Sequence, residues 1–286
     1  MKIGIIGLGL IGGSLGLDLR DHGHTILGVS RKKNTCKLAV ERGVVDEASV
    51  DLKLLSNVDI IFICTPVGLI IPTLEQLISH LKAKTIVTDV GSVKTSIVER
   101  GSRLWDKFIG GHPMAGTTEQ GIEAAQKKLF KNAPYVITPT PNNLSRDVEI
   151  LKTIVNELGS IVYTCTSENH DCAVAWISHL PVMTSASLIS ACLAEKEYSI
   201  FELAKNLASS GFRDTSRVGG GNSELGVMMA EYNQKALLRS LSEYRQQLDQ
   251  IIALIEHKDW QKLREILEKT KQARTNFLDK NNSSKR

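Results

Sequence analysis

The chain has 286 residues, of which 42% are hydrophobic and 23% are charged. This composition is typical of a soluble globular protein, and the length is comfortable for two domains. The formal net charge of +4 is small, and no run of Lys and Arg residues indicates binding to nucleic acid.

The sequence also carries no signal for export or for a membrane. A predicted strand begins at residue 2, which leaves no room for a signal peptide, and no apolar run reaches the length of a membrane span. The five cysteines are odd in number and lack C-x-x-C spacing, so we interpret them as reduced thiols rather than as a disulfide framework or a zinc site. These features predict a cytoplasmic protein.

A short apolar strand, a glycine-rich turn and a helix follow one another at the start of the chain. Residues 2–6 are rich in isoleucine, as in a buried parallel strand. The spacing of Gly7, Gly9 and Gly12 fits a dinucleotide site, because it permits a tight turn, close approach of a pyrophosphate and close packing of helix on strand. The same spacing occurs in plain loops, but the flanking strand and helix favour the nucleotide site. We assign the binding of the cofactor phosphates to Gly7, Gly9, Leu10, Ile11 and Gly12.

The end of the second predicted strand, at residues 25–29, indicates which dinucleotide binds. An NAD site usually has Asp or Glu about 20 residues after the glycines, where the carboxylate holds the ribose 2′-hydroxyl. Here Ser30 stands at that position, Arg31 follows it, and Thr35 offers another hydroxyl. A hydroxyl and a guanidinium would bind a 2′-phosphate, whereas a carboxylate would repel it. A solvated basic loop would explain the cations but not the missing acid, so the sequence favours NADP over NAD.

Further strands and helices alternate over the first 165 residues. We expect strands at 58–64, 85–89, 108–110, 135–138 and 161–164, with helices between most of them. This alternation predicts an N-terminal Rossmann-type α/β domain with a doubly wound, mostly parallel sheet. Three loops leave the carboxyl edge of the sheet, where open α/β sheets bind ligands, at residues 65–66, 91–94 and 111–116. We expect the cofactor to contact Thr65, Pro66 and Ser92 in the first two of these loops.

Strands disappear after about residue 166, and helices are predicted at 170–178, 181–194 and 199–210. Asn222 or Ser223 is a suitable N-cap for a further helix that we expect to run unbroken to residue 257, over roughly 50 Å at about 1.5 Å per residue. Apolar residues recur along it four and three apart, at Leu237, Leu241, Tyr244, Leu248, Ile251 and Ile255. So long an apolar rod favours a homodimer over a monomeric helical bundle. We predict an NADP-binding domain at 1–165 and an all-helical substrate-binding and dimerisation domain at 166–286.

A few polar side chains in these regions could carry chemistry. His112 lies between Gly111 and Pro113, and an imidazole that titrates near neutrality can accept a hydroxyl proton. A histidine that merely hydrogen-bonds its own loop is the alternative. Arg213 and Arg217 lie four residues apart, which places both guanidiniums on one helical face, where they could clamp a carboxylate or simply be solvated. The sequence has no cluster with metal-ligand spacing, so we expect no metal site.

Five short segments occur in a fixed order along nearly the whole chain: GLGLIGGS at 7–14, DVGSVK at 89–94, GHPMAG at 111–116, SHLP at 178–181 and GFRDTSR at 211–217. This succession resembles the prephenate/arogenate dehydrogenase family of tyrosine biosynthesis. The resemblance implies that His112 is the catalytic histidine, that Ser92 assists it, and that His179 and Arg217 bind substrate. Because of its spacing from Arg217, Arg213 is a further candidate for substrate binding.

The resemblance also implies a function, which is the oxidative decarboxylation of arogenate to tyrosine, or of prephenate to 4-hydroxyphenylpyruvate, with hydride transfer to NADP. The chain is similar to short NADP-dependent arogenate enzymes, so we expect arogenate as the substrate and tyrosine as a competitive inhibitor. Two alternatives stay open: another NADP-dependent enzyme, such as a β-hydroxyacid dehydrogenase or imine reductase, and a non-catalytic NADP(H)-sensing protein.

Overall fold

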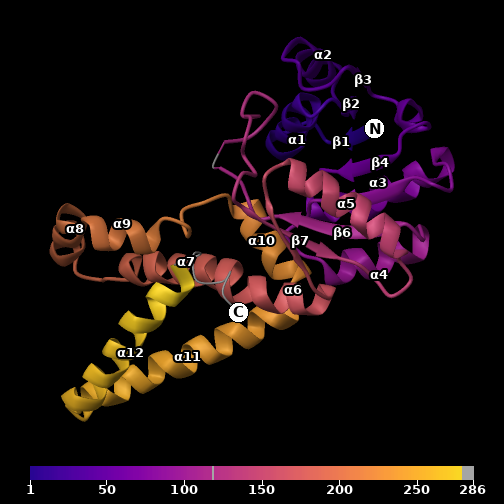
Figure 1. Cartoon of the computed structure of the whole chain (residues 1–286). Coiled ribbons are helices and arrows are strands. Elements are labelled where there is room, and N and C mark those ends of the chain that lie inside the picture. The colour runs from indigo at the N-terminus through magenta and orange to yellow at the C-terminus, as the bar shows by residue number, and fades with distance from the viewer. Residues whose placement is uncertain (118, 279–286) are drawn as a thin grey trace. The chain divides into compact units, whose positions relative to one another are not determined.

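A computed structural model describes residues 1–117 and 119–278, and the strands of this part form one sheet (Figure 1). Their order is β3-β2-β1-β4-β5-β6-β7-β8, and all neighbours are parallel except β6 and β7. This confirms the predicted doubly wound, mostly parallel sheet. The strands are β1 (Lys2–Ile6), β2 (Thr25–Val29), β3 (Glu47–Ser49), β4 (Ile60–Ile63), β5 (Ile86–Asp89), β6 (Phe108–Pro113), β7 (Pro134–Thr138) and β8 (Ile161–Thr164).

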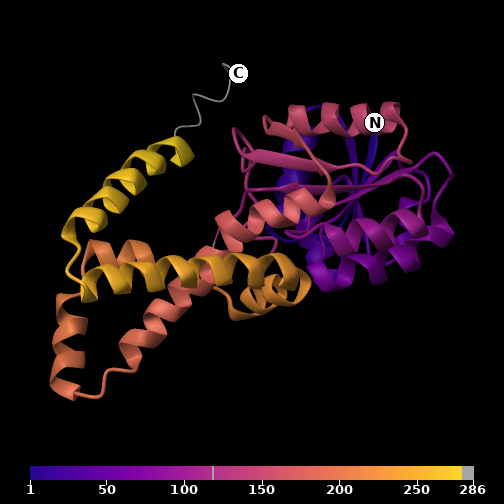
Figure 2. The same cartoon turned by 90° about the horizontal axis from the view of Figure 1, so that it is seen from below.

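Helices cover both faces of the sheet, and Figure 2 shows the resulting three layers from the side. One face is packed by α1 (Leu10–Asp21), α2 (Lys33–Glu41) and α5 (Ser145–Glu157), and the other by α3 (Val67–Leu77), α4 (Thr95–Leu104) and the 3₁₀ turns η1 (Leu52–Leu55) and η2 (Ile78–His80). Because both faces are covered, central strands are apolar on both sides, and all four residues of β4 are buried.

Two strands differ from the expected sheet. β6 extends to Pro113, three residues beyond the predicted end, because residues 110–113 pair with residues 135–138 of β7 in antiparallel register. His112 therefore lies in a strand, opposite Val136, and not in the loop where we expected it. The short strand β3 was not predicted, since its three residues are too few to show an apolar alternation.

The helical part begins with one continuous run where two separate helices were expected. α6 (Ser167–Val174) passes through a π-turn, η3 (Ala175–His179), into α7 (Leu180–Leu193). The prediction placed a break before Pro181, because the proline ring and its missing N–H disrupt a regular α-helix. The π-turn accommodates this disruption without ending the helix.

The joined run at residues 167–193 is 27 residues long and apolar. By length and composition alone, it is the one helix of the described residues that could cross a membrane, with a mean hydropathy of 1.4. This corrects our expectation that no apolar run has that length, which treated the two halves of the helix as separate. The run nevertheless contains three buried titratable residues, His170, Asp171 and His179, which bind other groups of the protein.

Three further helices belong to the same compact unit, which comprises residues 1–236. They are α8 (Tyr198–Leu207), α9 (Ser210–Ser216) and α10 (Ser223–Tyr232). The joint between α9 and α10 packs closely against α7 at Gly219, whose N–H donates to Ser185 Oγ at 2.8 Å. A Cβ at Gly219 would lie 2.4 Å from the backbone nitrogen of Ala186. Glycine is therefore required for this close approach of two backbones.

A second compact unit starts at Leu237 and contains most of α11 (Gln234–Glu256) and all of α12 (Trp260–Leu278). The predicted unbroken helix from residue 222 to residue 257 is wrong, because α10 ends at Tyr232 and α11 begins at Gln234. Asn233 between them has φ of −124° and ψ of 32°. Its side chain, instead of facing solvent on a helix, donates to the Asp171 carbonyl oxygen.

Replacing Gly219 by alanine should destabilise the first compact unit, because the new Cβ would press on the backbone at Ala186. Forced overpacking of this kind costs about 1–3 kcal/mol of unfolding free energy. Gly211→Ala in α9 is the matched control, since no other atom lies within 4 Å of the place that its Cβ would occupy, and it should cost less than about 0.5 kcal/mol or stabilise the helix. Urea denaturation of both variants measures the difference, and equal stabilities would contradict this account of the joint.

Candidate active site

The glycine turn lies where the chain crosses from one half of the sheet to the other, at the carboxyl ends of β1 and β4. Gly7 has φ of +96°, and a Cβ there would lie 2.6 Å from the Cys64 carbonyl oxygen. A Cβ on Gly12 would lie 2.1 Å from the Gly7 carbonyl oxygen, so glycine lets α1 start directly against β1. Gly9 instead has open space where its Cβ would be. This space is what a pyrophosphate needs in order to approach the backbone.

Groups that can bind a nucleotide converge on this turn. α1 begins at Leu10 and Ile11, and no side chain caps its first N–H groups. At the end of the neighbouring strand, Thr65 Oγ1 is buried and lacks a hydrogen-bond partner among the described residues. Buried hydroxyls are normally paired, so this one fits a polar group of a bound ligand. Pro66, which follows it, is exposed. The residues present thus fit a nicotinamide dinucleotide.

The end of β2 carries the residues that we expect at the adenosine ribose. Ser30 is half-buried, and its backbone N–H donates to the Ser49 carbonyl oxygen at 3.2 Å. Arg31 follows and is exposed, and Thr35 is half-buried in the first turn of α2. A guanidinium and two hydroxyls therefore stand close together in the chain just past this strand.

A buried ion pair joins the end of β5 to the segment before α4. The side chains of Asp89 and Lys94 are both fully buried, and Lys94 Nζ donates to the carboxylate. It also donates to the Gly111 carbonyl oxygen at 2.8 Å, while Asp89 accepts from the N–H groups of Gly91 and Gly111. Burial lowers the pKa of Lys94, and the charge of Asp89 opposes that shift. The pair holds β6 in place immediately before His112.

His112 is half-buried, and its ring meets a second histidine from the helical part. Its Nδ1 lies 2.8 Å from Nε2 of His170 in α6, and the two ring planes form an angle of 71°. Burial lowers the pKa of His112 well below its usual value, and the charges of His170, Lys94 and His179 act in the same direction. At neutral pH His112 is therefore an uncharged imidazole, which is the form that can accept a proton.

Asp171 connects this pair of imidazoles to the start of α4. One of its carboxylate oxygens lies 2.8 Å from His170 Nδ1. The carboxylate also accepts from the backbone N–H groups of Lys94 and Thr95, at 2.7 and 2.8 Å. Burial by itself would raise the pKa of Asp171, but the hydrogen bonds from His170, Thr95 and Lys94 hold it below its usual value. Asp171 is therefore a buried carboxylate whose charge faces His170.

His179 lies fully buried at the end of η3, close to the same cluster. Its Nδ1 lies 3.1 Å from Asn233 Nδ2, which can only donate, so the neutral ring carries its proton on Nε2. Burial lowers the pKa of His179 to about 4, although the charge of Asp171 acts the other way. Nε2 is buried and lacks a partner among the described residues. His179 therefore supplies an unused N–H donor beside the cluster.

The structure brings some, but not all, of the predicted catalytic and substrate-binding residues together. His112 and His179 belong to one cluster, and Ser92 lies half-buried in the loop two residues before Lys94. Arg213 lies in α9 and Arg217 directly follows it, and both are exposed. Among the described residues, the polar partner of the His112 ring is His170 and not either arginine.

Two family models match the chain. The model of the nucleotide-binding domain of prephenate dehydrogenase matches residues 15–164, and the model of its dimerisation domain matches residues 166–269. The chain belongs to the prephenate dehydrogenase family. This membership gives the chain an arogenate/prephenate dehydrogenase activity, an oxidoreductase activity of tyrosine biosynthesis, and a helical dimerisation domain after the nucleotide-binding sheet. The family and the function that the five segments predicted are confirmed.

Individual members of the family cover most of the chain. The prephenate dehydrogenases of Lactococcus lactis and Bacillus subtilis are 31% and 30% identical over 97% and 91% of this chain, and over 80% and 71% of their own length. Synechocystis arogenate dehydrogenase is 59% identical, with a TM-score of 0.91 over 97% of this chain and 100% of that one. A prephenate dehydrogenase from Aquifex aeolicus, in complex with hydroxyphenyl propionate and NAD⁺, shares the fold at 24% identity, with a TM-score of 0.90 over 97% of this chain and 98% of its own.

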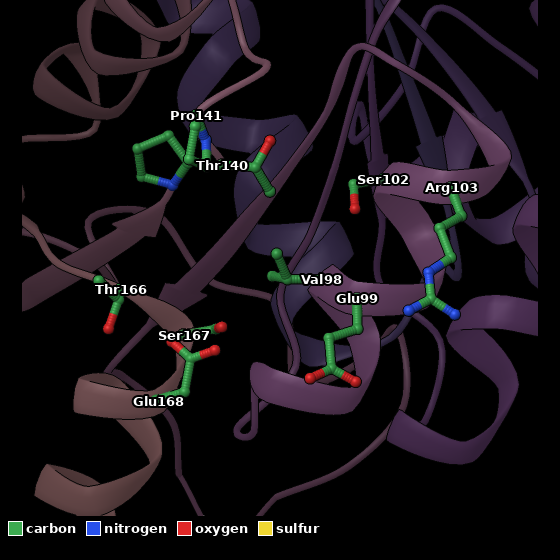
Figure 3. A pocket seen from close by; sticks show the side chains of 10 residues that line it. Val98, Glu99, Ser102, Arg103, Thr140, Pro141, Thr166, Ser167 and Glu168 are labelled. Carbon is green, nitrogen blue, oxygen red and sulfur yellow. The ribbon is translucent and has the colours of Figure 1, made fainter.

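Two surface cavities are found in this family member. One, of about 310 Å³, opens between α4, the turn after β7 and the start of α6, where Glu99, Arg103 and Glu168 line it (Figure 3). It adjoins the end of β7, where Thr138 pairs with Gly110 of β6. The other, of about 970 Å³, is mostly apolar and lies among α7, α8 and α9 in the dimerisation domain. The predicted site residues line neither cavity.

Sequence reasoning missed the residues that support the cluster. His170 and Asp171 are 58 and 59 positions from His112, and a His-Asp dipeptide near a helix start has no distinctive spacing. Asn233 was hidden in an apparently regular helix. The DVGSVK segment contains both Asp89 and Lys94, but their pairing is a property of the folded loop. Their signal was a carboxylate at the end of a short strand that follows an apolar pattern, with a lysine five residues later.

Lys94→Met should leave the Asp89 carboxylate buried without its counter-charge. Removing one partner of a buried ion pair costs about 3–5 kcal/mol of unfolding free energy. Lys84→Met is the control, because it removes the exposed partner of Asp59 at 3.3 Å and should cost about 1 kcal/mol or less. Urea denaturation near neutral pH measures the unfolding free energy of both variants. Equal losses of unfolding free energy would show that the buried pair stabilises the fold no more than the exposed pair of Lys84 and Asp59 does.

Proposed function

We propose that arogenate is the preferred substrate of this dehydrogenase and that NADP is its preferred cofactor. The observation that carries the choice of substrate is the 59% identity to Synechocystis arogenate dehydrogenase along almost the whole of both chains. The prephenate dehydrogenases of Lactococcus lactis and Bacillus subtilis are about half as similar, at 31% and 30% identity. This difference favours arogenate over prephenate.

The end of β2 supports NADP. Ser30 occupies the position where an NAD site usually has a carboxylate, and the exposed guanidinium of Arg31 follows it. Charge-assisted hydrogen bonds from Arg31, with the hydroxyls of Ser30 and Thr35, suit a 2′-phosphate. The NAD⁺ bound to the Aquifex aeolicus protein belongs to a relative at 24% identity, so it does not argue against NADP here.

We assign the central chemical step to His112. The uncharged imidazole of His112 accepts the proton of the substrate's ring hydroxyl, while the carbon that bears this hydroxyl loses a hydride. The nicotinamide of a dinucleotide whose pyrophosphate is held at the glycine turn would supply the hydride acceptor. Loss of carbon dioxide from the opposite ring carbon then leaves a phenolate, which regains the proton from His112 to give a phenol, and aromatisation makes the reaction favourable. The contributions of the chain are the orientation of the hydroxyl and the removal of its proton.

Other residues hold the substrate in this proposal. Ser92, in the loop after β5, assists His112 at the hydroxyl, and the unpartnered Nε2–H of His179 donates to a substrate oxygen. Arg217, with Arg213, pairs with a substrate carboxylate. Because one chain leaves both arginines exposed, we propose that the protein acts as a homodimer through its dimerisation domain. We also propose competitive inhibition by tyrosine and a cytoplasmic location.

Assays of arogenate and prephenate, each with NADP and with NAD, test the proposal directly. The pair arogenate and NADP should give the highest kcat/KM. In Ser30→Asp, repulsion of the 2′-phosphate should lower kcat/KM for NADP about tenfold or more, since a charged hydrogen bond is worth about 1.5–3 kcal/mol. The NAD reaction of the same variant is the internal control and should not fall. A wild-type preference for NAD or for prephenate would overturn the corresponding half of the proposal.

His112→Gln should lower kcat/KM for arogenate about 10²–10⁴-fold, the range for a lost general base. A lowered pKa keeps the ring uncharged further into the acid range. In the wild type, kcat/KM should therefore stay level as pH falls through 6.5, the usual histidine value, and decline only at lower pH. Initial rates across this range supply the profile. An unchanged rate in the variant, or a wild-type decline centred at or above 6.5, would show that this histidine is not the base.

A further inference from the structure

A chain of hydrogen bonds runs from the start of α4 through two side chains of α6 to His112 in β6. The backbone N–H groups of Lys94 and Thr95 donate to Asp171. The Asp171 carboxylate lies 2.8 Å from His170 Nδ1, and His170 Nε2 lies 2.8 Å from His112 Nδ1. His170 and Asp171 are both buried, at 2% and 4% exposure, so water does not compete for these bonds.

The donors in this chain can be assigned in order, starting from the carboxylate. Asp171 is ionised and can only accept, so His170 Nδ1 must carry a proton and donate it. In an uncharged His170 ring, Nε2 is then an acceptor. Because His170 Nε2 accepts, its partner His112 Nδ1 must be the donor. His112 Nδ1 therefore carries the proton of the uncharged His112 ring. The remaining nitrogen, Nε2 of His112, therefore presents a lone pair.

We propose that His170 and Asp171 are positioning residues that hold His112 in the Nδ1-protonated tautomer and stabilise the charge it gains during the reaction. This inference rests on the proposed role of His112 as the base. When the substrate O–H bond breaks, the proton binds His112 Nε2 and the ring becomes an imidazolium. Its Nδ1 proton then lies in a hydrogen bond to His170, and can pass to His170 Nε2, with Asp171 opposite as the counter-charge.

The other charged groups around His112 do not supply this stabilisation. Lys94 and His179 both oppose a positive charge on the ring, and so does His170 whenever its own ring is charged. His170 can therefore take part only as an uncharged ring that accepts from His112. The Asp89 carboxylate is held by Lys94 Nζ and by two backbone N–H groups. The carboxylate connected to His112 through a hydrogen-bonded ring is that of Asp171. The cluster thus keeps His112 uncharged at rest and provides one route by which a positive charge can be shared.

His170 is a better position for the test than Asp171, because Asp171 also caps α4 and its loss would disturb folding. His170→Leu removes both the acceptor for His112 and the donor to Asp171. His170→Gln keeps an amide that can accept from His112 and donate to Asp171, but cannot take up a proton. His22→Gln is the matched control, since His22 is exposed at the end of α1.

We expect His170→Leu to lower kcat by about 10²-fold or more, in line with the loss of a tautomer-fixing partner in other enzymes. KM for substrate and the dissociation constant for NADP should change little, because the glycine turn and the proposed substrate groups are retained. His170→Gln should recover much of kcat, and His22→Gln should match the wild type. Nitrogen-15 NMR of the His112 ring should show its proton on Nδ1 in the wild type and in His170→Gln, and a shift toward Nε2 in His170→Leu.

Several results would overturn the inference. One is a wild-type kcat in His170→Leu, and another is a His112 proton on Nε2 in the wild type. Equal losses of kcat in the leucine and glutamine variants, accompanied by lowered thermal stability in both, would indicate a merely structural residue. The variants also separate this inference from the proposed function. If His112→Gln is inactive and His170→Leu is normal, only the positioning role fails, whereas an active His112→Gln removes the base itself.

Discussion

The carboxylate of Asp171 is the interaction on which the arrangement of the site depends. It accepts from the first backbone N–H groups of α4 and from the ring of His170, while the carbonyl oxygen of the same residue accepts from Asn233. α4 belongs to the nucleotide-binding domain, and α6 and the segment after α10 belong to the helical part. One residue therefore aligns three elements that are distant in the sequence, and a displaced Asp171 would leave several buried polar groups unpaired at once.

The apolar surroundings give this small polar cluster its chemical properties. Both faces of the sheet are packed by helices, so the carboxyl ends of β5 and β6 are shielded from water. In such surroundings Lys94 and Asp89 must pair, and a charged imidazole is disfavoured. The same burial that makes the ion pair a strong constraint thus keeps His112 in the form that can take a proton. The ion pair and the protonation state of His112 depend here on one physical cause.

The two halves of the family's fold contribute different things to the reaction. The glycine turn offers open space at Gly9 and Thr65 an unpartnered hydroxyl, which suit groups that every dinucleotide shares, whereas the helical part brings buried polar groups such as His179 close to His112. Arg213 directly follows Phe212, which lines the apolar cavity of the dimerisation domain, and Arg217 directly follows the end of α9.

The sequence by itself determined most strands of the sheet, the glycine turn and the family, because these depend on local patterns. A buried strand needs an unbroken apolar run, and the turn needs glycine at Gly7, where φ is positive, and at Gly12, where a Cβ would meet the backbone. We selected His112 from its family segment and not from its surroundings.

Only the tertiary structure decided the partners of these residues. His112 bonds to a side chain 58 residues away, Lys94 to one 77 residues away, and His179 to one 54 residues away. The extension of β6 and the break at Asn233 likewise follow from pairing with distant elements. Such contacts leave no periodic trace in the chain, because a hydrogen bond between buried polar groups requires only that folding bring them together, whatever their separation along the sequence.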